Sequence, residues 1–128
     1  ENNPLRILDS KDEKDKKLIE GSPDIRDFWD IESRRAFEDI SRGFDSLGID
    51  YQFNRFLVRG LDYYNDTVFE WKSKNLGSQD AICAGGRYDY LIQSLYETQV
   101  PAVGVAFGVE RLVELIKLDN NSGKIFRT

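Results

Sequence analysis

The sequence has no histidine, no methionine and a single cysteine, Cys83, among its 128 residues. Without histidine, a histidine-based catalytic triad cannot form, and a zinc site would have to depend on carboxylates. A single cysteine excludes an internal disulfide bond. Because translation starts with methionine and this chain begins at Glu1, we expect it to be either processed or a segment of a longer protein, and we favour the segment.

The chain also lacks a long apolar run, a signal-peptide pattern and a positive net charge. No stretch of about 18 residues is uninterruptedly apolar, which predicts a soluble, cytoplasmic protein that does not enter a membrane. Lys and Arg number 18 against 23 Asp and Glu, a net charge of −5, which argues against a nucleic-acid binder with a broadly basic surface. Apolar residues make up 40% of the sequence, enough for a core.

The first 50 residues have helical patterns. Residues 11–17 form a charge cluster typical of a solvated helix face. Ser22 is a candidate N-cap for a helix whose first residue is Pro23, and Asp30 is a candidate N-cap for a helix that should end at Gly48. The second helix is expected to bury one apolar stripe, namely Phe37, Ile40, Phe44 and Leu47. Its opposite face is expected to be exposed, with a contact to RNA phosphate left open: Arg34, Arg35, Asp39 and Arg42.

After residue 50 the apolar residues alternate, as in strands. Residues 51–58 and 67–73 are predicted to form two strands of an antiparallel pair that spans 51–72. Two short apolar runs predict buried strands, of which the first, without a polar face, should be central: residues 81–85 and 101–108. Two helices are predicted between and after them, the second packed on the sheet: residues 87–95 and 109–118.

These patterns together predict an α+β fold, in which helices flank an antiparallel sheet behind a helical N-terminal section. We divide the chain into a helical section at residues 1–50, a sheet-containing core at 51–118 and a linker or tail at 119–128.

Three short segments carry residues suited to binding a ligand. In RGLDYY, the Arg59 fork can bind a carboxylate or a phosphate. Tyr63 and Tyr64 should point to opposite faces if the backbone is extended, so that only one shares a cavity with Arg59. The alternative for such a pair is half-buried packing with the hydroxyls in water.

The other two segments combine glycine with arginine. In CAGGRYD, Gly85 and Gly86 allow close approach of a ligand and free their amides for an anion, unless they simply form the turn after a strand. In GVAFGVERL, the glycines leave room for a flat group, and Arg111 in an apolar helix needs an acidic partner or a ligand phosphate. None of the segments is a dinucleotide-binding signature. Together they predict a cavity for a small anionic, partly aromatic ligand.

The same segments resemble those of a known family. LVRGLDYYNDTVFEW and AICAGGRYD are similar to the two histidine-specific signatures of the histidyl-tRNA synthetases, which are class II aminoacyl-tRNA synthetases. PAVGVAFGVERLVELI resembles class II motif 3, and the helical section resembles the insertion before the first signature. The resemblance covers residues 3–118, and it implies part of a class II catalytic domain.

The resemblance also implies a role for individual residues. Arg59 matches the catalytic arginine that contacts the histidine carboxylate and the ATP α-phosphate as the adenylate forms. Tyr64 and Tyr88 match the tyrosines of the imidazole pocket, and a glycine pair leaves room for the bound amino acid, here Gly85 and Gly86. Arg111 matches the motif 3 arginine that binds ATP.

The reaction implied is activation of histidine by ATP with Mg²⁺, without zinc, followed by transfer to histidine tRNA in a homodimer. Motifs 1 and 2 and the anticodon-binding domain have no counterpart in these 128 residues, so the isolated chain is expected to be inactive. The sequence departs from the family at Tyr90, where a glycine is usual, and at Tyr96-Glu97, where a glycine pair is usual. These changes concern the looseness of the loop near the pocket rather than the identity of the pocket.

Two related families remain as alternatives. One is the non-catalytic regulatory subunit of ATP phosphoribosyltransferase, and the other is the synthetase-like, tRNA-sensing domain of a stress kinase. Histidine binding would distinguish the synthetase from the kinase-type domain. The signature residues Arg59, Tyr64, Tyr88 and Arg111 are all present, which favours the synthetase.

Overall fold

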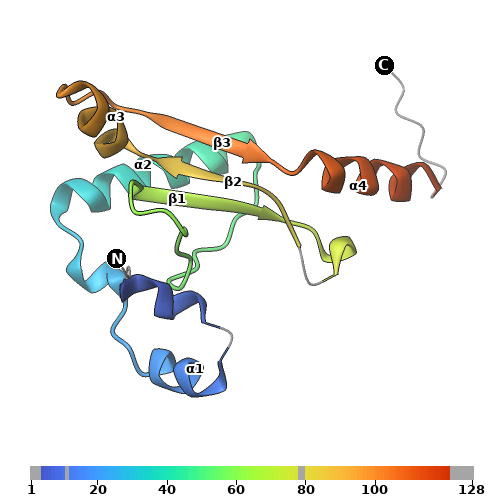
Figure 1. The fold of residues 1–128 in the computed structure, drawn as a ribbon, viewed down its shortest axis with the longest axis horizontal. Helices are drawn as coiled ribbons and strands as arrows, with labels where there is room; N and C mark the ends of the chain where they lie inside the picture. Colours follow the sequence, from blue (N-terminus) through green and yellow to red (C-terminus); the bar gives the residue numbers. More distant parts are fainter. Residues whose placement is uncertain (1–3, 11, 78–79, 122–128) are drawn as a thin grey trace. The chain divides into compact units, whose positions relative to one another are not determined.

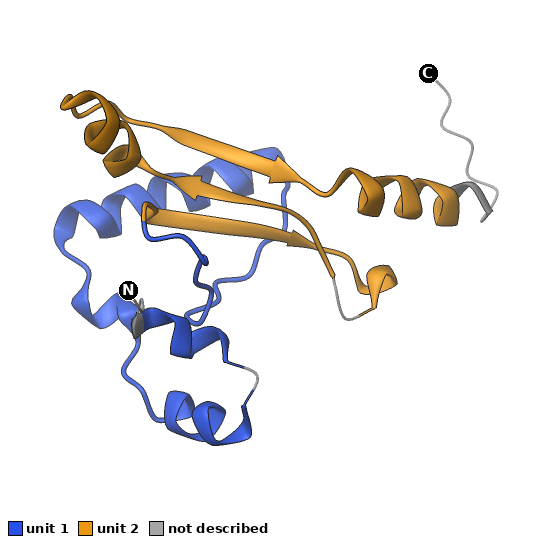
Figure 2. Ribbon diagram, in the orientation of Figure 1, with its two compact units in different colours: residues 1–62 blue, residues 63–128 orange. Residues whose placement is uncertain are grey.

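The computed structural model describes residues 4–10, 12–77 and 80–121. They belong to two compact units, residues 1–62 and 63–128, which we describe separately (Figure 2). The first holds the 3-10 helices η1 (Pro4–Asp9) and η2 (Ile25–Phe28) and the helices α1 (Glu13–Glu20) and α2 (Ile31–Leu47). The second holds β1 (Asn65–Lys72), η3 (Lys74–Leu76), β2 (Ala81–Arg87), α3 (Asp89–Tyr96), β3 (Val103–Phe107) and α4 (Val109–Asn121).

The α+β class is therefore confirmed. The boundary between the two units falls after residue 62 of the chain, and α4 extends into the tail predicted at 119–128, of which 122–128 lie outside the described residues. Within the described part of the chain, no helix is both long and apolar enough to cross a membrane.

Helix α2 begins and ends where the sequence predicts. The Asp30 carboxylate accepts a hydrogen bond from the Ser33 backbone N–H at 2.7 Å, and Gly48 has the left-handed φ of 66° that ends a helix. Ser22, by contrast, is not an N-cap, because its hydroxyl donates backwards to the Ile19 carbonyl at 2.7 Å. Asp24 caps η2 in its place, since its carboxylate accepts from the Arg26 backbone N–H at 2.9 Å.

The strand predicted at residues 51–58 is wrong. Within the described part of the chain this segment has no strand partner, and its aromatic side chains pack against the helical elements of the first unit instead. Phe53 meets Trp29 and Phe37 with ring centroids 5.9 and 5.5 Å away. Arg55 donates to the carbonyl of Ser22 at 3.1 Å. The alternation of aromatic and polar residues therefore reflects packing on helices. In sequence, this pattern looks the same as that of a strand.

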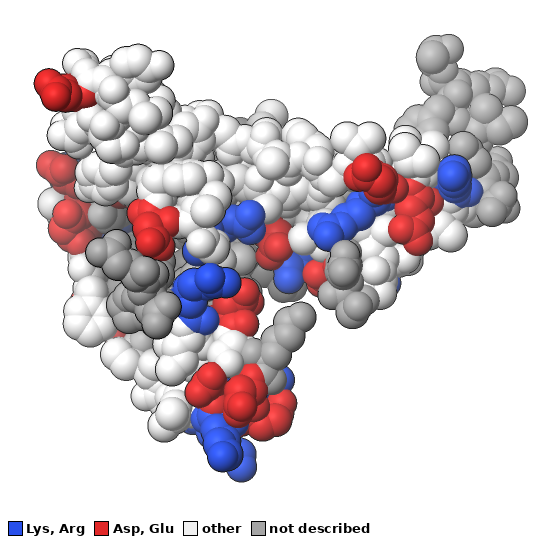
Figure 3. All heavy atoms as spheres, in the orientation of Figure 1, with Lys and Arg blue, Asp and Glu red and all other residues white. Residues whose placement is uncertain are grey.

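The apolar stripe of α2 is only partly covered. Phe37 and Phe44 are half-buried through ring contacts with Phe53 and Tyr51, whereas Leu47 is 73% exposed. The periodicity of the sequence therefore indicated the direction of the stripe but not how much of it is buried. The opposite face is exposed as predicted, and so is most of α1, around which acidic and basic side chains gather in Figure 3.

The second unit contains a three-stranded antiparallel sheet in the order β1-β2-β3 (Figure 1). The predicted strands at 67–73 and 81–85 are confirmed, and β2 is central, as its lack of a polar face predicted. Gly85 and Gly86 lie inside β2 and pair with residues on both neighbouring strands, so they form no turn. Their backbone groups belong to the ladder, and the prediction that their amides are free for an anion is wrong.

Strand β3 forms where predicted but is not buried. It is the edge of the described sheet, with Val103 72% and Phe107 56% exposed, and it carries no charged side chain (Figure 3). Helix α4 continues beyond the end of β3 in Figure 1 rather than covering the sheet, and Val109 and Val113 remain exposed. An edge strand without a neighbour on one side cannot be buried by the sheet alone.

Candidate functional site

Two glycines form the floor of the candidate site. Gly86 and Gly104 lie opposite each other in β2 and β3, so their missing side chains would project from the same face of the sheet. A Cβ on Gly86 would lie 3.0 Å from Cδ1 of Tyr64, and a Cβ on Gly104 would lie 2.6 Å from Oη of Tyr88. Both tyrosines therefore cover this face. The room predicted at Gly104 for something flat is filled by the ring of Tyr88.

Three tyrosine rings gather on this face. Tyr64 and Tyr88 are almost perpendicular, with centroids 6.2 Å apart and planes at 89°, and Tyr63 stands 5.9 Å from Tyr88. Tyr63 and Tyr64 do not point to opposite faces, because Tyr63 lies in a turn and the two rings are 4.7 Å apart. Side chains of neighbouring residues point to opposite faces only where the backbone is extended, and the strand begins only at Asn65.

A hydrogen-bonded network lies directly beside these rings. Asp89, only 5% exposed, accepts from the Arg87 Nε at 2.7 Å and from the Ala102 backbone N–H at 2.8 Å. Its own backbone N–H donates to the Asn65 side-chain oxygen at 2.8 Å. The donated bond from Ala102, together with the Arg87 guanidinium, lowers the pKa of Asp89. This network was not predicted from the sequence, in which an acidic residue directly after the signature arginine and tyrosine is its only signal.

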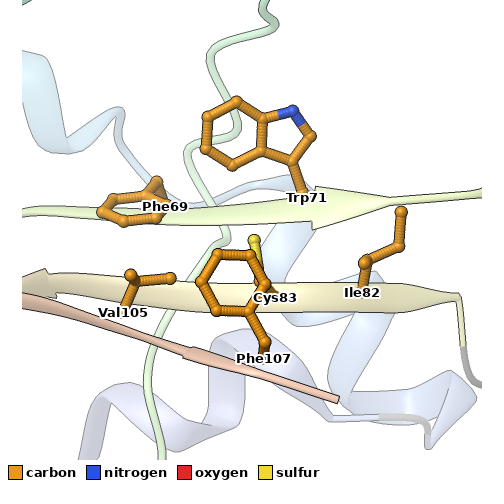
Figure 4. A pocket seen from close by; sticks show the side chains of 6 residues that line it. All are labelled: Phe69, Trp71, Ile82, Cys83, Val105 and Phe107. Carbon is orange, nitrogen blue, oxygen red and sulfur yellow. The ribbon is translucent and has the colours of Figure 1, made fainter. Parts of the chain in front are cut away.

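Gly85 belongs to the other face of the sheet. A Cβ there would lie 2.1 Å from the Gly104 carbonyl oxygen and 2.9 Å from Cζ of Phe69. That face carries an open apolar hollow of about 350 Å³, lined by Phe69, Trp71, Ile82, Cys83, Val105 and Phe107 (Figure 4). The close approach of the strands accounts for a glycine at position 85. Whether it also makes room for an amino acid stays a prediction.

Arg111 has a partner within the second unit. Its Nη1 donates to the Ala81 carbonyl at 2.5 Å, at the start of β2, and its Cδ passes 3.2 Å from where a Cβ of Gly108 would be. Because Gly108 has no side chain, the aliphatic part of the Arg111 side chain can pass across the end of the strand. The bond fixes the guanidinium at the end of the sheet opposite Arg87, the last residue of β2.

Arg59 belongs to the first unit. Its side chain is half-buried, and its Nε is buried without a hydrogen-bond partner among the residues that the structure describes. A buried guanidinium N–H without an acceptor is unfavourable, so this atom is suited to an anionic oxygen. Of the predicted site residues, the structure brings Tyr64, Gly86 and Tyr88 together on one face of the second unit.

The described residues contain no group of three or more Cys, Asp and Glu side chains that could hold a metal ion. Mg²⁺ that accompanies a nucleotide is held largely by phosphates and water, with one or two carboxylates. The prediction of Mg²⁺ as a partner of ATP therefore does not depend on such a cluster, and it stays a prediction.

Comparison with known proteins identifies the family. The sequence profile described as "Histidyl-tRNA synthetase" matches residues 5–112. The chain belongs to the histidyl-tRNA synthetase family. It is 56% identical over 114 residues to the histidine–tRNA ligase of Anaplasma phagocytophilum and 57% identical over 115 residues to that of Buchnera aphidicola. These matches cover 89% and 90% of the chain and 27% of each ligase.

A solved structure from the same family is also similar. The apo histidyl-tRNA synthetase of Staphylococcus aureus superimposes with a TM-score of 0.67 at 34% identity, covering 84% of this chain and 28% of that one. The chain therefore spans about a quarter of the length of its histidyl-tRNA synthetase relatives, and the tyrosine face described above lies within the part that they share.

Proposed function

We propose that the chain is part of the catalytic domain of a class II histidine–tRNA ligase and forms one wall of its histidine pocket. The observation that carries this proposal is the pair of perpendicular rings, Tyr64 and Tyr88, over the glycine floor at Gly86 and Gly104. An imidazole is small and flat, so two ring faces at right angles can enclose it on two sides.

The chemistry we assign is histidine activation. The histidine carboxylate attacks the α-phosphorus of ATP, pyrophosphate leaves, and histidyl-adenylate is formed for transfer to histidine tRNA. Arg59 would stabilise the negative charge shared by the carboxylate and the α-phosphate, since a preplaced cation acts where charge develops. Its unpartnered Nε supports this role.

Arg111 would contact ATP, with Mg²⁺ bound to the phosphates. Its bond to the Ala81 carbonyl fixes the guanidinium at one end of β2, and a planar guanidinium can stack on an adenine while it keeps in-plane hydrogen bonds. Gly86 would leave room for the amino acid on the tyrosine face, and Gly85, which faces the other side of the sheet, would let the neighbouring strands approach closely behind that pocket. We further propose that the parent ligase is a cytoplasmic homodimer that acts away from membranes and that this chain alone is inactive.

The experiment replaces the matching segment of the Anaplasma phagocytophilum ligase with residues 5–112 of this chain, which we call the chimera. Histidine-dependent exchange of pyrophosphate into ATP is measured, with each of the other amino acids as control. We expect the chimera to catalyse exchange with histidine and with none of the other amino acids, and we expect no exchange from the isolated chain. A folded chimera that exchanges with another amino acid, or not at all, would contradict the proposal.

A further inference from the structure

Asp89 connects three separate parts of the second unit. Its carboxylate oxygens accept from Arg87, at the end of β2, and from the Ala102 backbone, just before β3. Its backbone N–H donates to Asn65, the first residue of β1. It is the one charged residue that is buried among those described, at 5% exposure. Burial of a charge is favourable only where it is fully paired, and both oxygens here are paired.

Tyr88 lies between the two residues of this ion pair. Arg87 and Asp89 are joined at 2.7 Å, and the backbone N–H of Tyr88 donates to the Ala102 carbonyl at 2.9 Å. Its φ of −149° and ψ of 50° belong to neither strand nor helix, so the chain changes direction at this residue. The hydrogen bonds on either side therefore determine where the Tyr88 ring points.

The direction of that ring matters on the tyrosine face. The Tyr88 hydroxyl lies over Gly104, and the ring meets Tyr63 and Tyr64 edge-on, at 74° and 89°. A rotation of the Tyr88 backbone would move the hydroxyl off the glycine floor and change the angle between the two pocket rings.

We infer that Asp89 is the positioning residue of the histidine pocket, which sets histidine affinity by holding Tyr88 between β2 and β3. The inference rests on the proposed function, because it takes Tyr88 as a pocket wall. Asp89 touches no substrate in this account. The Asp89 carboxylate accepts a hydrogen bond from the Ala102 N–H, and the Ala102 carbonyl accepts one from the Tyr88 N–H. Ala102 therefore holds both Tyr88 and Asp89 in place.

The test uses the chimera and its Asp89→Asn variant, with Asp45→Asn on the exposed surface of α2 as the matched control. Pyrophosphate exchange gives KM for histidine and for ATP separately. We expect Asp89→Asn to raise KM for histidine about tenfold, which corresponds to a loss of about 1.4 kcal/mol in binding free energy, and to leave KM for ATP unchanged. Asp45→Asn should change neither.

A double variant separates positioning from general destabilisation. In a Tyr88→Leu background, Asp89→Asn should add no further increase in KM for histidine, because the ring that it positions is gone. An equal increase in both backgrounds, or parallel changes in both KM values, would overturn the inference. If Asp89→Asn does not fold, Asn65→Ala decides by the same criteria, because it removes the acceptor of the Asp89 N–H. An inactive parent chimera would contradict the proposed function, whereas an active one unaffected by these substitutions would contradict only this inference.

Discussion

Gly85→Ala tests the packing of the sheet that supports the candidate site. A Cβ at this position would lie 2.1 Å from the Gly104 carbonyl oxygen and 2.9 Å from the Val105 Cα. Both are backbone atoms of β3, paired with β2, and they cannot move aside without breaking the register of Gly85 with Val105. The third contact, the Phe69 Cζ at 2.9 Å, belongs to β1 on the other side.

The expected loss of stability is at the upper end of the range for overpacking. Extra carbon atoms in a packed interior destabilise by about 1–3 kcal/mol, and we expect about 3 kcal/mol because two of the three contacts are with backbone. The matched control is Gly43→Ala in α2, where a Cβ would meet nothing within 4 Å. There alanine should stabilise the helix by ~0.5–1 kcal/mol.

The two tryptophans allow the units to be followed separately, because Trp29 belongs to the first and Trp71 to the second. In a Trp29→Phe background, urea unfolding followed by Trp71 fluorescence reports on the sheet, and Gly85→Ala should shift the transition to lower urea. In a Trp71→Phe background, Gly43→Ala should shift the Trp29 transition to higher urea. A Gly85→Ala transition at or above that of its parent would refute the packing argument.

Three further outcomes follow from local structure. Asp30→Ala removes the N-cap of α2 and should destabilise the first unit by about 1 kcal/mol in urea unfolding, whereas an unchanged transition would show that the cap is dispensable. Glu97→Gly should stabilise the second unit by about 1 kcal/mol, since Glu97 has a left-handed φ of 55° at the end of α3; a loss of stability would contradict this. The lowered pKa of Asp89 lies below the ordinary value of about 3.9, so its stabilisation is complete above that pH and is lost as the pH falls through the folded-state pKa. The stability advantage of the parent over Asp89→Asn, measured by urea unfolding, should therefore shrink on acidification below about pH 4, and an advantage that stays constant would contradict the assignment.

The sequence predicts those features of the fold that depend on local chemistry. Asp30 and Gly48 mark the ends of α2 because a side-chain acceptor and a left-handed glycine act within a few residues. The central position of β2 follows from its apolar residues on both faces. The segment at 51–58 was misassigned because alternating aromatic residues suit a strand and a helix-packed coil equally well.

The candidate site was predicted only in part, because several of its contacts join residues that are far apart in the sequence. The glycine Gly86 could be singled out by its residue type, and Tyr64 and Tyr88 were assigned by the family resemblance, but the contact of Tyr88 with Gly104 depends on the register of β2 and β3. The network of Asp89 joins residues from position 65 to position 102, and no local pattern predicts such a set.

Arg59→Ala in the chimera tests whether this chain contributes the arginine at which histidine and ATP react. The control is Arg42→Ala, which removes an exposed arginine that pairs with Asp39 on α2. We expect histidine-dependent pyrophosphate exchange to fall about 10²–10³-fold in Arg59→Ala, the effect of removing one charge-stabilising donor, while Arg42→Ala retains the parent rate. Equal rates in the two variants, with both folded, would contradict the account.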